Sequence, residues 1–96
     1  MDHVRDSFSR QKAMALIGAS LSAVEAGASE ITLPYRPDIT QQKGFVHGGI
    51  IGMIADSAAG YAAFSLMPAD ASVLTVEYKI NLLAPEAVID GLFWFG

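Results

Sequence analysis

The chain has 96 residues, enough for one small domain, and 52% of them are hydrophobic. Six basic residues are scattered among ten acidic ones, giving a net charge of -4, so nucleic-acid binding is not expected. The lack of cysteine excludes disulfides, a thiolate nucleophile and a cysteine zinc site. Because a small domain buries only a modest core, the apolar excess predicts a homo-oligomer in which a second copy covers apolar surface.

The first third of the sequence predicts a short helix followed by a hairpin. Apolar residues among polar ones indicate an amphipathic helix over Asp6–Ala15 that closes near Gly18. A weak alternation predicts a strand over Ser20–Glu25, and a stronger one predicts a second strand over Glu30–Tyr35. The small residues Ala26–Ala28 between them are typical of a turn.

The central part predicts a long helix and then a long strand. After a polar loop over residues 36–45, a helix is expected from the triplet at His47 to about Met67, where Pro68 stops it. Residues Ser72–Leu83 alternate between a polar and an apolar face, which predicts a strand. The order of elements indicates an α+β domain with a helix packed on an antiparallel sheet.

The long apolar stretch, Val46–Met67, is about the length of a membrane span, but Asp56 lies at its middle. A carboxylate at the centre of a bilayer costs about 2.5–3.5 kcal/mol, and the small residues around it do not offset that cost. A buried helix is therefore predicted rather than a membrane span. The acidic N-terminus, Met1–Asp6, lacks the apolar core of a signal peptide, so a cytoplasmic location is expected.

Asp56 is the only charged residue of this helix, and on a helical wheel small residues surround it. Gly49, Gly52, Gly60 and Ala63 fall within about 40° of Asp56. Aspartate has poor helix propensity, and no basic residue stands four positions away on either side. Two interpretations are open: a structural carboxylate, or a catalytic one in a groove that a substrate can approach closely.

The triplet His47-Gly48-Gly49 lies where the predicted helix begins. The first backbone N–H groups of a helix lack intrahelical acceptors, so they can polarise a carbonyl or hold an oxyanion. A tight turn into the helix is the alternative explanation for the glycines. Gly48 and Asp56 are separated by about 12 Å of helical rise, too far to act on one carbonyl. If both act, a site shared between two subunits of an obligate dimer is expected.

Three segments resemble PaaI-type hotdog thioesterases of phenylacetic acid degradation: Gly44–Gly49, Ala55–Ala63 and Leu74–Pro85. The spacing from the triplet His47-Gly48-Gly49 to Asp56 is the specific part of this resemblance. It implies a hotdog fold, in which an antiparallel sheet wraps a long central helix. It also implies homodimers, often paired into homotetramers, that hydrolyse acyl-CoA thioesters without a cofactor or metal. Aryl-acetyl or medium-chain acyl-CoA is the implied substrate.

The resemblance also implies roles for single residues. Asp56 is similar to the catalytic carboxylate, acting as general base on water or as nucleophile, and Gly48 to the residue whose N–H polarises the thioester carbonyl. Gln41 and Thr75 complete the catalytic set: Gln41 is implied to lie near the carbonyl, and Thr75 to orient water.

The two remaining site residues, His47 and Gly49, are implied to contact the substrate as part of the binding loop. His47 is expected to shape this loop rather than to transfer a proton. No metal or cofactor ligands are expected, since the two histidines of the chain stand far apart in the sequence.

One departure from the family concerns the C-terminus. Members of the family continue for several dozen residues with strands that complete the sheet, and Leu92–Phe95 does not resemble that continuation. These four large apolar residues are instead typical of an aggregation-prone segment. Residues 1–96 are therefore expected to form a single hotdog domain that is truncated and lacks its last strands.

Two alternatives to a thioesterase stay open. A hotdog hydratase or dehydratase would use His47 and Asp56 together, although nine helical residues place them on opposite faces. A non-catalytic relative would bind acyl-CoA without cleaving it.

Overall fold

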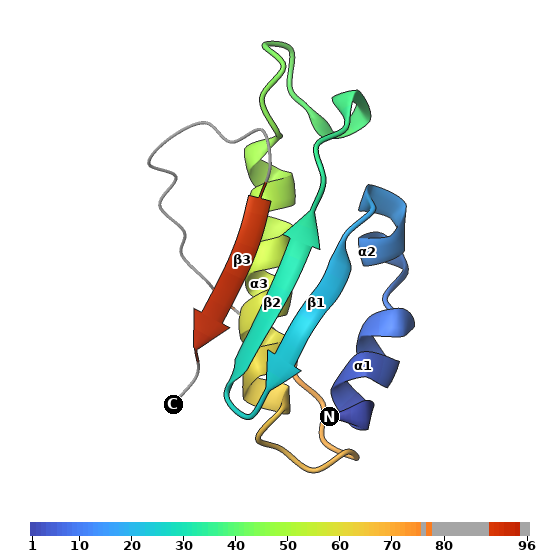
Figure 1. Cartoon of the computed structure of the whole chain (residues 1–96), viewed down its shortest axis with the longest axis vertical. Helices are drawn as coiled ribbons and strands as arrows, with labels where there is room; N and C mark the ends of the chain where they lie inside the picture. The colour runs from blue at the N-terminus through green and yellow to red at the C-terminus, as the bar shows by residue number, and fades with distance from the viewer. Residues whose placement is uncertain (76, 78–88, 95–96) are drawn as a thin grey trace.

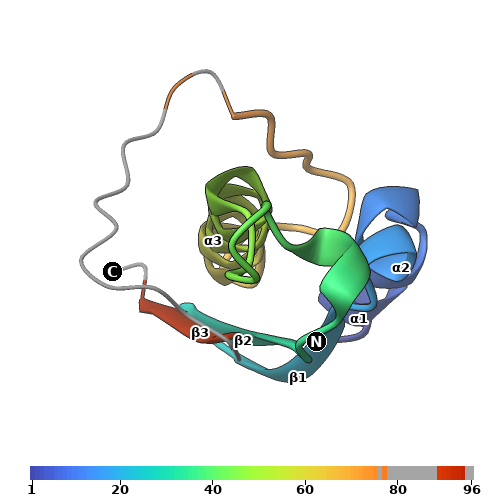
Figure 2. The ribbon, with the colours of Figure 1, turned by 90° about the horizontal axis from the view of Figure 1, so that it is seen from above.

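A three-stranded antiparallel sheet and one long helix form the centre of the molecule (Figure 1). A computed structural model describes residues 1–75, 77 and 89–94. The strands follow the spatial order β1 (Ser20–Glu25), β2 (Ala28–Leu33) and β3 (Ile89–Trp94). Helix α3 (Gly48–Phe64) crosses one face of this sheet, and the short helices α1 (Asp2–Ser9) and α2 (Lys12–Ile17) lie beside β1 (Figure 2). The predicted α+β arrangement of a long helix on an antiparallel sheet is confirmed.

The N-terminal region forms two helices where the sequence predicted one over Asp6–Ala15. The break falls at Gln11, whose backbone is extended with φ -82° and ψ 97°. There the Gln11 side chain turns toward α3 and hydrogen-bonds Ser57 and Tyr61, so a tertiary contact overrides the local helical pattern. The predicted end of this region is confirmed, because Gly18 terminates α2 with a φ of 79°.

The hairpin is confirmed, with β2 beginning two residues earlier than predicted. Glu25 pairs directly with Ala28, so only two residues form the turn. Gly27 supplies the positive φ of 81° that such a tight turn requires. Strand β2 ends at Leu33, immediately before Pro34, which has no N–H to donate to a sheet.

Strand β1 carries a bulge that the sequence pattern did not reveal. The register shifts between Leu21 and Ala23, so one extra residue stands opposite β2. As a result Leu21 and Val24, three residues apart, are the half-buried positions of the strand. The simple two-residue alternation expected for this strand is therefore wrong.

Helix α3 ends at Phe64, three residues before the predicted end at Met67. The Ser65 hydroxyl donates to the carbonyl of Ala62 at 2.6 Å, inside the last turn. The chain then leaves the helix before Pro68, so proline is not the direct terminator. Among the described residues, no helix is long and apolar enough to cross a bilayer.

Two buried serines connect α3 to the sheet. Ser65 accepts a hydrogen bond from the Gly27 N–H at 2.8 Å, and Ser29 donates its hydroxyl to the Ala58 carbonyl at 2.5 Å. These two bonds fix the position of α3 along its axis relative to the β1–β2 hairpin. Around them the main core is apolar and consists of Met14, Ile17, Ile31, Leu33, Ile39, Val46, Ile54 and Ala58.

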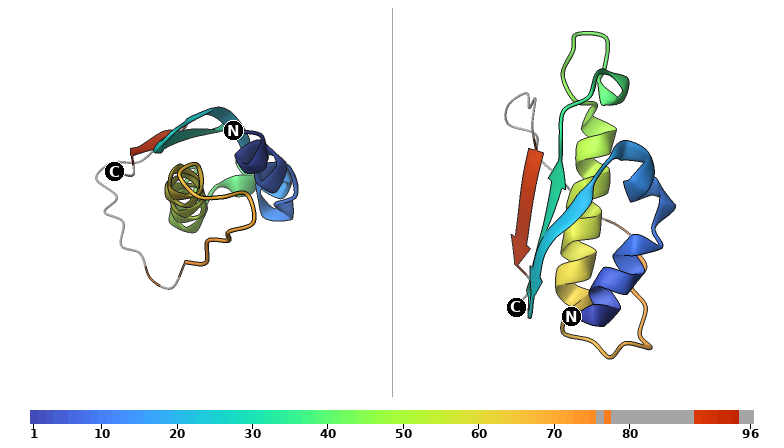
Figure 3. Two further views of the ribbon diagram at one scale, coloured as in Figure 1. Left: turned by 90° about the horizontal axis from the view of Figure 1, so that it is seen from below. Right: turned by 45° about the vertical axis from the view of Figure 1, so that its right-hand side comes forward.

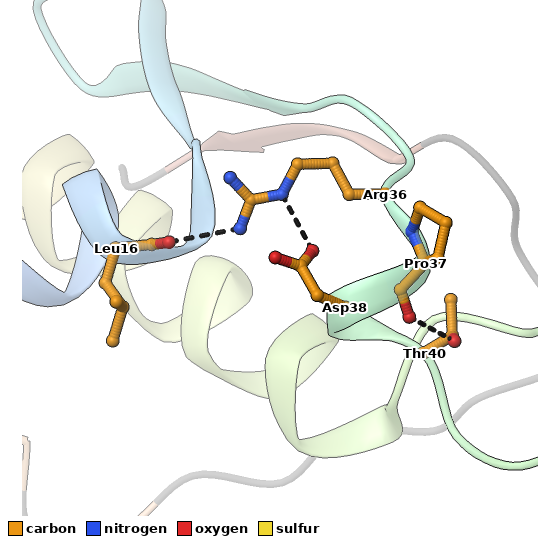
Figure 4. Close-up of polar contacts among 5 residues, drawn as sticks. All are labelled: Leu16, Arg36, Pro37, Asp38 and Thr40. Atoms are coloured by element: carbon orange, nitrogen blue, oxygen red, sulfur yellow. Dashed lines mark hydrogen bonds and ion pairs between the residues drawn. The ribbon is translucent and has the colours of Figure 1, made fainter.

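An arginine clip joins the end of α2 to the chain that leads into the loop before α3 (Figure 4). Arg36 donates to the Leu16 carbonyl at 3.1 Å and pairs with Asp38 at 3.0 Å. Thr40 closes the short 3-10 helix η1 (Pro37–Ile39) by donating its hydroxyl to the first carbonyl of η1 at 2.6 Å. The chain just before the loop over residues 40–47 is thus fixed by the Arg36 contacts to α2 and Asp38 and by the Thr40 bond to η1.

The strand predicted over Ser72–Leu83 is wrong for its first residues. Residues 72–75 have no regular secondary structure, and residues 76 and 78–83 lie outside the described part of the chain. Residues 72–75 run on the side of α3 opposite the sheet, where no described strand is available as a partner (Figure 2). Their contacts are instead with α3, since a methyl group on Gly60 would lie 3.8 Å from Val73.

The C-terminal segment forms a strand that the sequence analysis did not predict. Strand β3 pairs antiparallel with β2, from Leu33 opposite Ile89 to Ala28 opposite Trp94. Residues 92–94, expected to belong to an aggregation-prone end, are therefore paired in the sheet, and residue 95 lies outside the described part. A hydrophobic run at a sheet edge and an unpaired hydrophobic tail have the same sequence signature.

Candidate active site

Asp56 lies in the middle of α3, half-buried, on the face that residues 72–75 cover. The Thr75 hydroxyl donates to its Oδ1 at 2.5 Å. No lysine, arginine or histidine among the described residues forms an ion pair with Asp56. No described residue hydrogen-bonds its second oxygen, Oδ2, which leaves that oxygen available to a ligand or a water molecule.

A cavity of about 870 Å³ opens beside this carboxylate. Asp56 and Thr75 lie at its wall, which is lined by residues of α1, of α3 and of the segment that follows α3. Figure 3 shows α1 beside the C-terminal half of α3, which is the half that the cavity follows. The carboxylate therefore faces a space large enough for a small organic group.

The first turn of α3 leaves one amide without an acceptor among the described residues. The Nδ1 atom of His47 accepts from the Gly49 N–H at 2.9 Å, and the His47 carbonyl accepts from Ile50 at 2.9 Å and Ile51 at 3.2 Å. No described residue accepts a hydrogen bond from the Gly48 N–H. The helix dipole adds positive potential there. Gly48 is thus the open donor of this helix end.

The His47 cap explains on steric grounds why the second residue of α3, Gly49, is a glycine. A methyl group on Gly49 would lie 3.1 Å from His47 Nδ1 and 3.3 Å from the neighbouring ring carbon, tighter than most such contacts. A glycine therefore lets the imidazole lie over the first turn and cap it. In this arrangement the Gly49 N–H is already used, and the role of Gly49 in substrate binding stays a prediction.

Gln41 is held in a tight loop ahead of the helix. Its N–H donates to the Phe45 carbonyl at 2.8 Å, and its carbonyl accepts from the Gly44 N–H at 3.0 Å. Its side-chain oxygen accepts from the backbone N–H of Lys43. This bond orients the amide so that the NH₂ group has no described partner and can donate to a ligand.

The candidate residues form two groups on a single chain. Thr75 hydrogen-bonds Asp56 directly, whereas His47 and Gly48 lie at the helix start, about 12 Å of helical rise away, and Gln41 lies in the loop that precedes them. His47 and Asp56 are therefore not brought together within one chain, as a hydratase site would need. Within one chain the candidate residues therefore do not meet at one point.

A polar cluster in the cavity wall, formed by Gln11, Ser57 and Tyr61, was not predicted from the sequence. Ser57 and Tyr61 stand four residues apart on α3, a spacing that signals a shared helix face. Gln11 gave no such signal, because it lies 46 residues from Ser57 in the sequence and reaches it only in the fold.

Comparison with known proteins identifies the family. Residues 43–92, just over half of the chain, match the family model described as thioesterase superfamily. The chain belongs to the thioesterase superfamily. The matched region contains the capped helix start, Asp56, Thr75 and most of β3.

Two solved structures support the fold. A thioesterase family protein from Silicibacter pomeroyi is 53% identical with a TM-score of 0.84, over 86% of this chain and 61% of that one. The E. coli PaaI protein from the phenylacetic acid degradation operon has a TM-score of 0.84 at 16% identity, over 95% of this chain and 66% of that one. At that identity the PaaI likeness bears on the fold alone. The predicted hotdog fold is confirmed.

Curated relatives match over shorter stretches. A Saccharolobus solfataricus protein named "Putative esterase" is 39% identical over 62 residues, which are 65% of this chain and 44% of that protein. A Halobacterium salinarum protein with the same name is 30% identical over 75% of this chain and 51% of that protein. The chain thus spans about half the length of the curated relatives it matches.

The His47 cap predicts a measurable contribution to stability. Replacing an N-cap side chain with alanine typically costs about 0.5–2 kcal/mol, whereas asparagine is itself a good cap. We expect His47→Ala to lower the free energy of unfolding in urea by an amount in that range, and His47→Asn to stay close to the parent. Equal stability of the His47→Ala variant and the parent would show that the ring does not cap α3.

Proposed function

We propose that this chain hydrolyses acyl-CoA thioesters to a free acid and CoA, as a single hotdog domain that uses no metal or cofactor. Membership of the thioesterase superfamily supports thioester hydrolysis as the reaction class. The observation that carries the proposal is the half-buried Asp56, which has one oxygen on Thr75 and lies at the wall of a cavity. The PaaI-type sequence pattern favours aryl-acetyl or medium-chain acyl groups.

In the proposed reaction Asp56 acts as a general base. Its Oδ2 takes a proton from a water molecule, and the water oxygen attacks the thioester carbonyl carbon. Thr75 holds Oδ1 and so fixes the direction of the carboxylate. The Gly48 N–H and the Gln41 amide stabilise the oxyanion. When the intermediate collapses the C–S bond breaks, and the sulfur leaves as a thiol with the proton that Asp56 accepted.

A second route uses the same carboxylate as nucleophile. Asp56 would attack the carbonyl carbon, expel CoA and form a mixed anhydride, which water would then hydrolyse. A single turnover in water labelled with heavy oxygen detects one form of this second route. The label enters the Asp56 side chain only when water attacks the anhydride at the aspartyl carbon, and otherwise it enters the acid product alone.

The separation of the two groups along α3 supports a site shared by two copies. A donor must lie about 3 Å from the oxyanion, so a helical rise of about 12 Å from Gly48 to Asp56 excludes joint action by one chain. In a dimer, the open amide and Gln41 of one subunit would face the carboxylate and Thr75 of the other. A dimer, alone or paired into a tetramer, is therefore part of the proposal.

The first prediction concerns the carboxylate. Asp56→Asn keeps the shape and the hydrogen bond to Thr75 but removes the base, so we expect kcat for thiol release to fall about 10²- to 10⁴-fold. The assay follows free CoA with a thiol reagent on phenylacetyl-CoA and octanoyl-CoA. Glu25→Gln, a carboxylate-to-amide change at an exposed position of β1, is the matched control and should leave kcat unchanged. A full rate in Asp56→Asn would contradict the proposal, and so would binding of both thioesters by the parent without thiol release.

The second prediction concerns the open amide. Gly48 is the first helical residue, where proline is well tolerated, and His47 already has the extended ψ of 133° that a following proline requires. Gly48→Pro therefore deletes the N–H with little change in the backbone, and we expect kcat to fall about 10²- to 10³-fold. Gly48→Ala keeps the N–H and should retain most of the rate. Equal rates in the two variants would mean that this amide does not act.

A further inference from the structure

We propose that Gln11 determines acyl-group specificity by forming, with Ser57 and Tyr61, a neutral polar end to the cavity that selects an uncharged acyl group carrying a hydrogen-bonding substituent. This inference rests on the proposed function, since it takes the cavity beside Asp56 as the acyl site. It names three residues outside the six candidates that the sequence predicted.

The polar cluster is a connected set of hydrogen bonds. The Gln11 amide donates to the Tyr61 hydroxyl at 3.0 Å and accepts from the Ser57 hydroxyl at 3.2 Å. The hydroxyls of Ser7 and Tyr61 are 3.2 Å apart. Tyr61 is buried, and its ring contacts Phe8 edge-on with centroids 5.8 Å apart. The network is therefore fixed from both α1 and α3.

The position of the cluster fits the far end of an acyl group. Tyr61, which accepts from Gln11 at 3.0 Å, lies about 7.5 Å of helical rise beyond the carboxylate and forms the far side of the cluster, whereas Ser57 follows Asp56 directly and forms its near side. All four members of the network line the same cavity as Asp56. Gly60 and Val73 lie along the way and supply small or apolar surface. An acyl group held at Asp56 would thus run past Gly60 and Val73 and reach the Gln11 and Tyr61 side of the cluster.

The cluster has hydrogen-bonding capacity left over. Gln11 uses one N–H on Tyr61, so its second N–H has no acceptor among the described residues. The Ser57 hydroxyl donates to the Gln11 side-chain oxygen, and the lone pairs of its own oxygen have no donor among the described residues. A substituent that can both donate and accept, such as a hydroxyl group, can use both. A plain hydrocarbon chain would bury these groups without satisfying them, which is unfavourable.

The charges around the cavity disfavour an anionic substituent. Three carboxylates line it, those of Asp2, Asp6 and Asp56, against one arginine. That arginine, Arg10, is already paired with Asp6 at 3.1 Å. A carboxylate at the end of an acyl chain would therefore meet like charge without a free cation among the lining residues.

Three CoA thioesters of equal chain length test this inference: hexanoyl-CoA, ω-hydroxyhexanoyl-CoA and adipoyl-CoA. Their Kd values are measured by calorimetry on Asp56→Asn, which holds thioesters intact, and their kcat/KM values on the parent. One added hydrogen bond predicts that the hydroxy compound binds roughly 3- to 10-fold tighter than hexanoyl-CoA, with adipoyl-CoA weakest. Gln11→Leu in the same background should bring the ratio of the first two Kd values to about one. Tyr61→Phe, which keeps the buried ring, should reduce it as well.

The outcomes separate this inference from the proposed function. Thiol release with no preference for the hydroxy compound, or a preference unchanged by both variants, overturns the specificity role while hydrolysis stands. Tighter binding of the hydroxy compound without thiol release supports the specificity role of the polar cluster but rejects the proposed hydrolysis. Lack of measurable binding by all three compounds, with no release, rejects both.

Discussion

The proposed shared site depends on the fixed length of helix α3. An α-helix rises by about 1.5 Å per residue, so the eight residues between Gly48 and Asp56 keep an open amide and a carboxylate about 12 Å apart. Neither a side-chain rotation nor a small backbone shift can close that gap. Two helices related by symmetry can close it, because each then offers its start to the middle of the other. The helix therefore makes oligomerisation a condition of the proposed chemistry.

The rest of the fold holds the two groups of α3 in place. Ser29 and Ser65 fix the helix on the sheet through buried hydrogen bonds, so its carboxylate face points away from the sheet. His47 occupies the amide of Gly49 and leaves Gly48 as the donor. At the break between α1 and α2, the side chain of Gln11 turns into the cavity and hydrogen-bonds Ser57. The serine and Gln11 contacts join segments that are remote in sequence, and the His47 contact constrains the first turn of α3.

The sequence predicted what depends on local pattern and missed what depends on contacts. The hairpin, the start of α3 and the small-residue face around Asp56 follow from turn chemistry and helical periodicity. The break at Gln11 could not be predicted, because its partners lie 46 and 50 residues away. Strand β3 was missed because its hydrophobic run forms a strand by pairing with β2, a partner that is distant in sequence. The pairing of Thr75 with Asp56 is a feature of the fold, and the strand expected there is absent over residues 72–75.

Mixing two inactive variants tests the shared site most directly. Asp56→Asn keeps an intact Gly48 amide, and Gly48→Pro keeps an intact carboxylate, so a mixed dimer regains one complete site out of two. Unfolding and refolding the two variants together at equal amounts gives mixed dimers in half of the molecules, and about a quarter of the parental thiol release is predicted by this dimer symmetry. Refolding each variant alone should give none of it. If the mixture stays as inactive as the separate variants while mixed dimers are present, the two groups do not act across subunits.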